Sequence, residues 1–229
     1  VSARGFNDKY PARMQVLVDG RSVYSPLYSG VLWNEVPLFI EDIERIEIMR
    51  GPNATLYGAN AVCGIANIIT KKPKDKGVFT RGVYGTNNTQ AGMIRVDERI
   101  DKVSYCLSYG VNHDTGYKSP ENLNRPDFDR THKLAARGQY EITDNSALHF
   151  SGGIVKGNMG LTPALGDSSG VFSQFQMIKY DLDLSEDSSF FVNVFHNDVK
   201  YNFNSIVDSD NAATRQYDVE FGHSFVLAE

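Results

Sequence analysis

The sequence VSYCLSYGVN, residues 103–112, decides the fold of most of this chain. Its odd-numbered positions hold Val, Tyr, Leu, Tyr and Val, and its even-numbered positions hold Ser, Cys, Ser, Gly and Asn. Successive side chains of a β-strand point to opposite faces of the sheet, so this alternation predicts a strand with one apolar and one polar face. The same alternation recurs at 133–142 and 216–225, and less cleanly at 171–184 and 189–200.

The connections between these strands alternate in length. Short connections lie at 100–102, 143–146 and 185–188, and long ones lie at 113–131, 157–170 and 201–213. Transmembrane β-barrels have short turns at one end and long loops at the other, whereas a soluble β-sandwich has no reason to sort its loops in this way. From residue 77 onward the sequence therefore predicts a transmembrane antiparallel β-barrel, of which the chain holds about eight strands.

The N-terminal part of the chain has a different pattern. An apolar run at 14–18 ends in the turn dipeptide Asp19-Gly20, and further strands are predicted at 43–50 and 65–70. A short helix is predicted at 37–43, because proline suits the first helical position and acidic residues follow in the early turns. These elements predict a small mixed α/β domain in front of the barrel.

A polar segment, 71–76, marks the boundary between the two patterns, so the expected domains are 1–76 and 77–229. Residues 1–6 lack the charged and apolar regions of a signal peptide, and the last residues, 225–229, lie within a predicted strand. The first domain is therefore expected to be truncated at its N-terminus and the barrel at its C-terminus.

Composition excludes several classes of function. The formal net charge is −5, and Lys and Arg are scattered without a cluster, so no nucleic-acid partner is expected. The five His residues occur singly and no nucleophile or phosphate-binding motif is present, which predicts that the chain is not an enzyme and has no catalytic residues. Cys63 and Cys106 are expected to be free thiols, because they lack metal-ligand spacing.

The long connection 113–131 contains several carboxylates, which are the ligands that a calcium site would need. These residues are Asp114, Glu121, Asp127 and Asp129. Calcium needs several converging oxygen ligands, and no spacing here requires that convergence. A solvated loop is the expected structure, and no metal site is predicted.

Four motifs in order identify a family resemblance: VLVDGR at 16–21, IERIEIMRGP at 43–52, LYGANA at 56–61 and GIANIITK at 64–71. With these motifs the chain resembles the plug domain of TonB-dependent outer-membrane receptors over roughly residues 4–73. The plug motif positions are Asp19, Gly20, Gly51, Pro52, Tyr57, Gly58, Gly64 and Asn67. The barrel part resembles the family only in its pattern of strands and loops.

The resemblance implies a barrel of roughly 22 strands in the bacterial outer membrane, which the eight strands expected here cannot close. It implies energised uptake of a scarce solute, most naturally an iron–siderophore complex or a similarly large cofactor such as a corrinoid. The implied partners are an inner-membrane TonB energy-coupling protein, that small-molecule ligand and outer-membrane lipid. No resident cofactor is implied, because the iron chelate would be cargo.

The resemblance also suggests site residues. Arg45, Glu47 and Arg50 are candidates for a charged lock that holds the plug against inward-facing carboxylates of the barrel. Asp218 and Glu220 are inward-facing candidates for partners of that lock. On charge alone, the three plug residues could equally solvate the edge of a small sheet.

Residues 21–34 are predicted to form a loop between two plug elements, and in the family such loops face the ligand. Tyr24, Ser25, Tyr28 and Trp33 offer the aromatic and hydroxyl groups that suit a large amphipathic chelate. The alternative is that Tyr28 and Trp33 pack the plug against the barrel wall.

Two classes of protein are alternatives to the uptake receptor. One is an outer-membrane signal-transducing receptor of the same architecture, for which an additional N-terminal signalling domain would be the decisive feature. The other is a soluble β-sandwich binding module, which would leave the sorted loop lengths and the plug motifs unexplained.

Overall fold

The computed structural model describes residues 14–27, 29–51, 61, 63–116, 128–160, 168–204 and 209–226. The chain divides into two compact units, Val1–Lys72 and Pro73–Glu229. Regular structure in the described residues consists of β-strands and two short 3-10 helices. None of the helices in this part of the chain is long and apolar enough to cross a membrane.

The first unit contains a four-stranded mixed sheet in the order β2-β1-β4-β3. Its elements are β1 (Met14–Val18), β2 (Arg21–Ser22), η1 (Trp33–Glu35), η2 (Ile40–Asp42), β3 (Ile43–Arg50) and β4 (Gly64–Thr70). Strands β1 and β4 run parallel, whereas β2 pairs with β1 and β3 pairs with β4 in antiparallel fashion. The strands predicted at 14–18, 43–50 and 65–70 are therefore confirmed.

Both faces of the two central strands are buried. Val16 and Ile68 belong to an apolar cluster on one face of the sheet, while Leu17 and Ile65 belong to a second cluster on the other. Val16 is 2% exposed and Ile65 is 0% exposed. Parallel strands covered on both faces read as continuous apolar runs, which explains why residues 14–18 show no alternation.

The predicted helix at 37–43 is wrong. A single 3-10 turn, η2, covers residues 40–42, and its flanking residues Phe39 and Ile43 have extended backbone angles. Ile43 already belongs to β3 and pairs with Thr70 of β4. A segment this short gains little from helix formation, because the first turn fixes several residues for one hydrogen bond, so pairing with β4 prevails.

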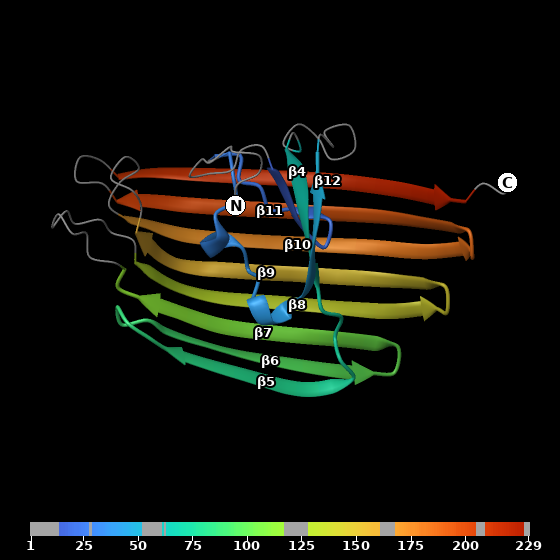
Figure 1. The fold of residues 1–229 in the computed structure, drawn as a ribbon, viewed down its shortest axis with the longest axis horizontal. Helices are drawn as coiled ribbons and strands as arrows, with labels where there is room; N and C mark the ends of the chain where they lie inside the picture. Colours follow the sequence, from blue (N-terminus) through green and yellow to red (C-terminus); the bar gives the residue numbers. More distant parts are fainter. Residues whose placement is uncertain are drawn as a thin grey trace. The chain divides into compact units, whose positions relative to one another are not determined.

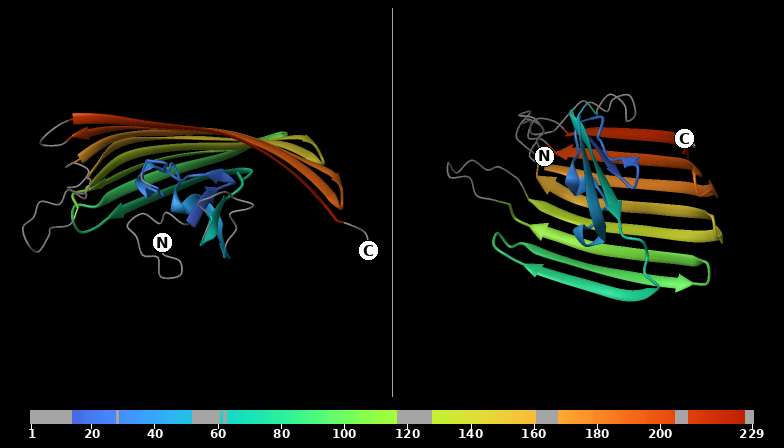
Figure 2. Two further views of the ribbon diagram at one scale, coloured as in Figure 1. Left: turned by 90° about the horizontal axis from the view of Figure 1, so that it is seen from above. Right: turned by 45° about the vertical axis from the view of Figure 1, so that its right-hand side comes forward.

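The second unit is one eight-stranded antiparallel sheet in which every strand pairs with its neighbour in sequence, from β5 to β12 (Figures 1 and 2). Its strands are β5 (Lys76–Tyr84), β6 (Gln90–Ile100), β7 (Val103–Asp114), β8 (Asp129–Thr143), β9 (Ser146–Gly160), β10 (Ser168–Ser185), β11 (Ser188–Asn204) and β12 (Ser209–Phe225). A β-sandwich needs two packed sheets. The described strands of this unit form a single curved sheet, so the sandwich alternative is wrong.

The connections of this sheet are sorted by length, as the barrel prediction requires. Residues 101–102, 144–145 and 186–187 form two-residue turns at one end, and the connections 115–128 and 161–167 lie at the other. The predicted long loop at 201–213 is too long, because β11 continues to Asn204 and β12 begins at Ser209. Cross-strand pairing such as Asn202 with Asn211 extends the sheet into that segment.

The apolar and polar faces of the sheet are reversed relative to those of a water-soluble protein. On β7, Tyr105, Leu107 and Tyr109 are 37%, 46% and 43% exposed, whereas Cys106 and Ser108 on the opposite face are 1% and 0% exposed. A water-soluble protein would hide the apolar face of such a sheet, because contiguous exposed apolar patches of this extent are rare on monomers. An outward apolar face and an inward polar face define an outer-membrane barrel wall.

Candidate functional site

The Asp19-Gly20 motif closes the hairpin between β1 and β2. Both residues have positive φ, 51° and 86°, which is the geometry of a tight two-residue turn. The carboxylate of Asp19 accepts hydrogen bonds from the backbone N–H of Thr70 at 2.8 Å and from its hydroxyl at 2.7 Å. The motif therefore joins the first turn of the plug unit to the last residue of β4, 51 positions later.

The two glycines that flank the 52–60 segment have backbone conformations that other residues rarely adopt. Gly51 has φ +119° and Gly64 has φ +153°. A Cβ on Gly64 would also lie 2.6 Å from the backbone oxygen of Met49 on β3, so this position requires glycine for β3 to approach β4. The remaining motif residues Pro52, Tyr57 and Gly58 lie outside the described residues, and Asn67 lies within β4, opposite Glu47.

The lock candidates lie on β3, the edge strand of the plug sheet. Arg45 is 54% exposed and forms ion pairs with Glu47 at 2.8 Å and with Glu44 at 3.2 Å. The hydrogen bond that Arg45 donates to the Glu47 carboxylate raises the pKa of Arg45 above its ordinary value. Arg50 is also exposed at the end of the strand. Because exposed ion pairs contribute little to stability, these charges are available for exchange with other partners.

The same strand carries exposed apolar residues. Ile46 and Ile48 are 54% and 63% exposed on the face of β3 that continues the covered face of β4. On β3, Ile46, Ile48 and Arg50 thus share one face, and Arg45, Glu47 and Met49 share the other. Ile43 at the start of β3 packs against the plug core, whereas Ile46 and Ile48 are exposed.

The predicted ligand-facing loop is more ordered than the sequence suggested. Residues 21–22 form β2, Ser25 bridges Gly30, and Trp33 begins η1, so the expectation of a continuous loop over 21–34 is wrong. Tyr24 is half-buried, Ser25 is buried and Trp33 is 45% exposed. Tyr28 lies outside the described residues.

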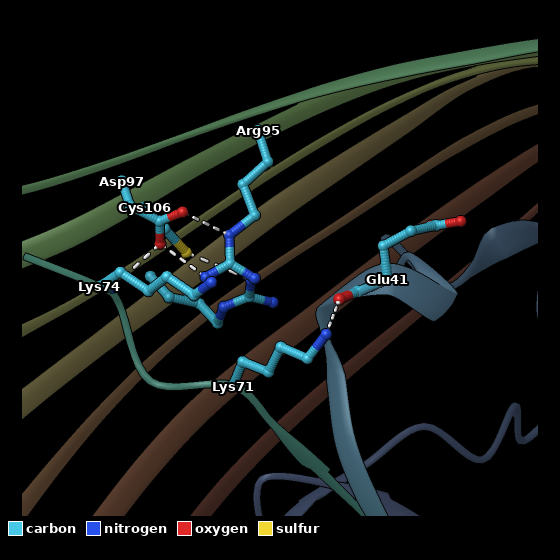
Figure 3. A network of polar contacts seen from close by, with 7 residues as sticks. Glu41, Lys71, Lys74, Arg95, Asp97 and Cys106 are labelled. Carbon is cyan, nitrogen blue, oxygen red and sulfur yellow. Dashed lines mark hydrogen bonds and ion pairs between the residues drawn. The ribbon is translucent and has the colours of Figure 1, made fainter. Parts of the chain in front are cut away.

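Three buried charged residues of the plug unit were not singled out from the sequence. Glu35 and Asp42, in η1 and η2, are 5% and 0% exposed, and Arg21 is 5% exposed. Burial lowers the pKa of Arg21 to about 9, against the opposing effect of the Asp19 charge. Near η2, Lys71 donates through its backbone N–H to the carbonyl of Asp42 and through Nζ to the carbonyl of Glu41 (Figure 3). Only the position of these residues in three dimensions identifies them, because isolated charges in a turn usually face solvent.

The inward face of the barrel sheet carries a buried ion pair. Arg95 binds Asp97 with two hydrogen bonds, at 2.9 Å from Nε and 2.6 Å from Nη2, and both side chains are about 5% exposed (Figure 3). The backbone N–H of Lys74 also donates to Asp97, and Arg137 contacts the Cys106 sulfur at 3.2 Å. Cys63 and Cys106 are both buried, and neither forms a disulfide bond.

Further charged pairs lie on the same inward face toward the two-residue turns. Asp181 contacts Lys179 at 2.8 Å and His149 at 3.2 Å, and Arg99 pairs with Glu141 at 2.8 Å. Asp218 and Glu220 of β12 occupy inward positions, because the register places them opposite Phe195 and Asn193. The inner wall therefore carries polar and charged side chains beside an apolar cluster of Phe175, Met177 and Phe195. The polar side chains suit an aqueous lumen.

The described part of the loop 113–131 contains no metal site. Asp114 lies opposite Asp129, and its carboxylate accepts hydrogen bonds from the backbone N–H groups of Gly116 and Asp129. Glu121 and Asp127 lie outside the described residues. Within the residues that the structure describes, no group of three or more His, Cys, Asp or Glu side chains converges as metal ligands would.

Comparison with known proteins agrees with this geometry. Residues 1–65 match the TonB-dependent receptor plug domain. The ferric enterobactin receptor PirA of Pseudomonas aeruginosa is 31% identical over 131 residues, which are 53% of this chain and 17% of that protein. The vitamin B12 transporter BtuB of Vibrio vulnificus is 40% identical over 70 residues, which are 31% of this chain and 11% of that protein.

Solved structures show the same fold. The alcaligin outer-membrane receptor FauA from Bordetella pertussis superposes with a TM-score of 0.73 at 12% identity, covering 90% of this chain and 34% of FauA. The siderophore receptor PirA from Acinetobacter baumannii gives a TM-score of 0.66 at 18% identity, covering 92% of this chain and 37% of that receptor.

A plug domain followed by strands with an apolar outer and a polar inner face defines one class of protein. Residues 1–65 match the plug domain of the TonB-dependent receptors, and the chain has the fold of outer-membrane receptors such as FauA. It spans about one sixth of PirA and about one ninth of BtuB. These relatives are named as receptors and transporters.

Proposed function

We propose that this protein takes part in energised uptake of a scarce solute through the outer membrane. The observation that carries the proposal is that a plug domain precedes a barrel wall whose inner face bears many polar and charged side chains. In this proposal residues 1–76 act as the plug and residues 77–229 as the first part of the barrel. A charged lumen allows a plug to be held by exchangeable ion pairs rather than by a permanent apolar interface.

In the proposed mechanism, Arg45, Glu47 and Arg50 hold the plug through such ion pairs, and pulling by an inner-membrane TonB protein releases them. The exposure of β3 and the short-range pairing of Arg45 with Glu44 and Glu47 support this role. Asp218 and Glu220 are the proposed barrel partners from this chain, because both occupy inward positions on β12. Exposed charges suit a reversible lock, since exchanging one ion pair for another costs little.

The proposed ligand is an iron–siderophore complex, with a corrinoid as the alternative. The relatives support this class, because PirA is named for ferric enterobactin and BtuB for vitamin B12. Tyr24, Ser25, Tyr28 and Trp33 are proposed to face the ligand. Trp33 is 45% exposed and can stack on a planar catecholate or corrin, whereas the buried Ser25 fits a supporting role in the Ser25–Gly30 bridge.

Uptake by intact cells tests the proposal. The full-length receptor is deleted from its host and restored on a plasmid, and cells receive radioactive iron as ferric enterobactin or radioactive cyanocobalamin. We expect receptor-dependent uptake of the ferric siderophore that stops when the proton gradient is collapsed. Uptake that continues without the gradient contradicts energised transport. If the cells take up cyanocobalamin but not ferric enterobactin, the proposed ligand is a corrinoid and not a siderophore.

A further inference from the structure

We propose that the segment 71–76 is anchored at both of its ends, and that Arg95 and Asp97 are the positioning residues that hold its barrel end. The plug unit and the barrel unit then pivot only about Lys72 and Pro73, which lie between the two anchors. The sequence predicts no such restriction, because residues 71–76 have the composition of a free polar linker. The inference rests on contacts within each unit and does not depend on the proposed uptake function.

The plug end of the segment is fixed at Lys71. Its backbone N–H donates to the carbonyl oxygen of Asp42 at 2.8 Å. Its Nζ donates to the carbonyl oxygen of Glu41 at 2.7 Å (Figure 3). Directly before it, Thr70 binds the Asp19 carboxylate through both its N–H and its hydroxyl. These bonds join η2 and the turn between β1 and β2 to the end of β4, so the chain as far as Lys71 moves with the plug unit.

The barrel end of the segment is fixed at Lys74. Its backbone N–H donates to Oδ1 of Asp97 at 3.1 Å. The guanidinium of Arg95 holds the same carboxylate with two hydrogen bonds, from Nε to Oδ2 at 2.9 Å and from Nη2 to Oδ1 at 2.6 Å (Figure 3). Lys76, two residues later, already pairs with Glu98 of β6. The chain from Lys74 onward is therefore bound to the barrel sheet.

The geometry of the Arg95–Asp97 pair suits a positioning role. Two hydrogen bonds from one guanidinium fix the orientation of a carboxylate as well as its location. Both side chains are 5% exposed, and a buried ion pair is weak evidence for stability, because desolvation offsets much of the attraction. The Arg99–Glu141 pair on the same inward face is 38% and 40% exposed and joins two barrel strands. The buried pair differs in that its carboxylate also accepts the N–H of Lys74.

Only Lys72 and Pro73 separate the two anchors. Lys72 is exposed and Pro73 is half-buried, and neither belongs to a helix or a strand. Proline fixes its own φ and restricts the preceding residue to extended conformations, so few torsions are free in this stretch. The division between the two compact units falls at the same place, between Lys72 and Pro73. The pivot is therefore short and stiff.

The two anchors limit the reach of the chain between the units. Lys71 and Lys74 are three residues apart in the sequence, so their Cα atoms are at most about 11 Å apart when the chain is fully extended. A linker that was free over 71–76 would span the seven steps from Thr70 to Gly77, which is about 25 Å. The anchored segment thus restricts the end of β4 to less than half the reach of a free linker.

Hydrogen exchange of single amides in the full-length protein, purified in detergent, tests the inference. Mass spectrometry with fragmentation resolves the amides of Lys71 and Lys74. The variants are D97A, which removes the acceptor of the Lys74 N–H, and R95L/D97L, which removes both charges and so leaves no buried charge unpaired. The matched control is E141A, which removes the carboxylate of the other ion pair. Exchange of the β6 and β7 amides confirms that each variant keeps the barrel sheet.

We expect the Lys74 amide to exchange about tenfold or more faster in D97A and in R95L/D97L than in the wild-type protein, since hydrogen bonds to charged groups are among the stronger ones in proteins. The Lys71 amide is expected to keep its wild-type rate in every variant, and E141A is expected to leave both rates unchanged. Equal Lys74 rates in the wild-type protein and in R95L/D97L overturn the proposal. Equal acceleration of Lys71 and Lys74 also overturns it, because the segment would then move as one free linker.

The same amides, followed during a titration with urea, separate the two anchors. We expect the Lys71 amide to lose protection together with the amides of β4, and the Lys74 amide together with those of β6, because each is bound to a different unit. Loss of protection at Lys74 while β6 is still protected overturns the barrel anchor. Neither measurement depends on the transported solute, so a negative result in the uptake assay leaves both interpretable.

Discussion

The plug unit and the barrel sheet use the same apolar residue types against opposite surroundings. In the plug, Val16 and Ile65 are 2% and 0% exposed. In the barrel sheet, Leu107 and Ile154 are 46% and 37% exposed, while Ser108 and Asp97 are buried. The plug is organised like a water-soluble domain, and the sheet is organised for lipid on one side and a polar lumen on the other. Burial of a residue is therefore set by the solvent that its element meets, and apolar character alone does not predict it.

The largest expected effect is a cavity in the plug core. Ile65→Ala removes a fully buried side chain between Leu17 and Ala61, and we expect a loss of about 2–5 kcal/mol in the free energy of plug unfolding. Ile48→Ala on the exposed face of β3 is the matched control and should change that free energy by about 0.5 kcal/mol or less. Hydrogen exchange of the β4 amides in the intact receptor measures both. Equal losses for Ile65→Ala and Ile48→Ala would show that the plug core includes the middle of β3.

A charge on the outer face of the barrel sheet should be nearly as costly. Leu107→Arg places a cation in the apolar band of β7, and we expect a loss of about 2–4 kcal/mol in folding into lipid vesicles. Gln139→Arg lies on the inner face of the neighbouring strand, opposite Ser104, and should be tolerated. The measurement is the urea dependence of vesicle folding. A larger loss for Gln139→Arg than for Leu107→Arg would reverse the assignment of lipid and lumen faces.

The Asp19–Thr70 contact should contribute an intermediate amount. Asp19→Ala removes two hydrogen bonds to Thr70 and places alanine at a positive φ, so we expect a loss of about 2–3 kcal/mol in plug stability. Asp19→Asn tolerates the same φ and keeps one acceptor, and it should lose about half as much. Amide exchange at Thr70 and Lys71 reports the change. Identical protection in both variants and wild type would mean that this contact does not hold the end of β4.

The smallest effect on stability is expected for the exposed charges of β3. Arg45→Ala removes ion pairs with Glu44 and Glu47, and we expect no measurable change in plug stability. The proposed lock instead predicts faster ligand-driven release of the plug, measured as the rate of cysteine labelling inside the lumen of the intact receptor. Lys72→Ala, another charge removal on an exposed plug residue, is the control and should leave that rate unchanged. Slower labelling in Arg45→Ala would contradict the lock.

The amino-acid sequence predicts the strands well where one face of a strand is apolar and the other is polar. The alternation at 103–112 identifies β7 and both of its faces, because the period of a strand is visible in a single segment. The prediction of a helix at 37–43 was wrong because the preferences of Pro37 and Glu41 for the start of a helix are weak. The pairing of Ile43 with Thr70 outweighs them. The loop predicted at 201–213 was too long for a related reason, because cross-strand pairing continues through polar residues such as Asn202 and Asn211.

The candidate site was only partly accessible to the same reasoning. Motif residues such as Asp19 and Gly64 were recognised by resemblance, and the structure supplies their physical role in the turn and in the approach of β3 to β4. The sequence does not predict the buried ion pair of Arg95 and Asp97. In the sequence, charged residues at alternate positions of a polar strand face cannot be distinguished from charges exposed to solvent.

Periodicity and motif order are local properties, so a plug-like domain followed by amphipathic strands can be predicted from the amino-acid sequence. Which residues meet across the chain depends on the tertiary structure. The Asp19 carboxylate finds Thr70 at a separation of 51 residues. His132 lies opposite Lys156, and Phe172 lies opposite Lys200, only because the cross-strand registers of β8 to β11 align. Register depends on pairing between distant segments, and a shift of one residue would move each of these side chains to the opposite face.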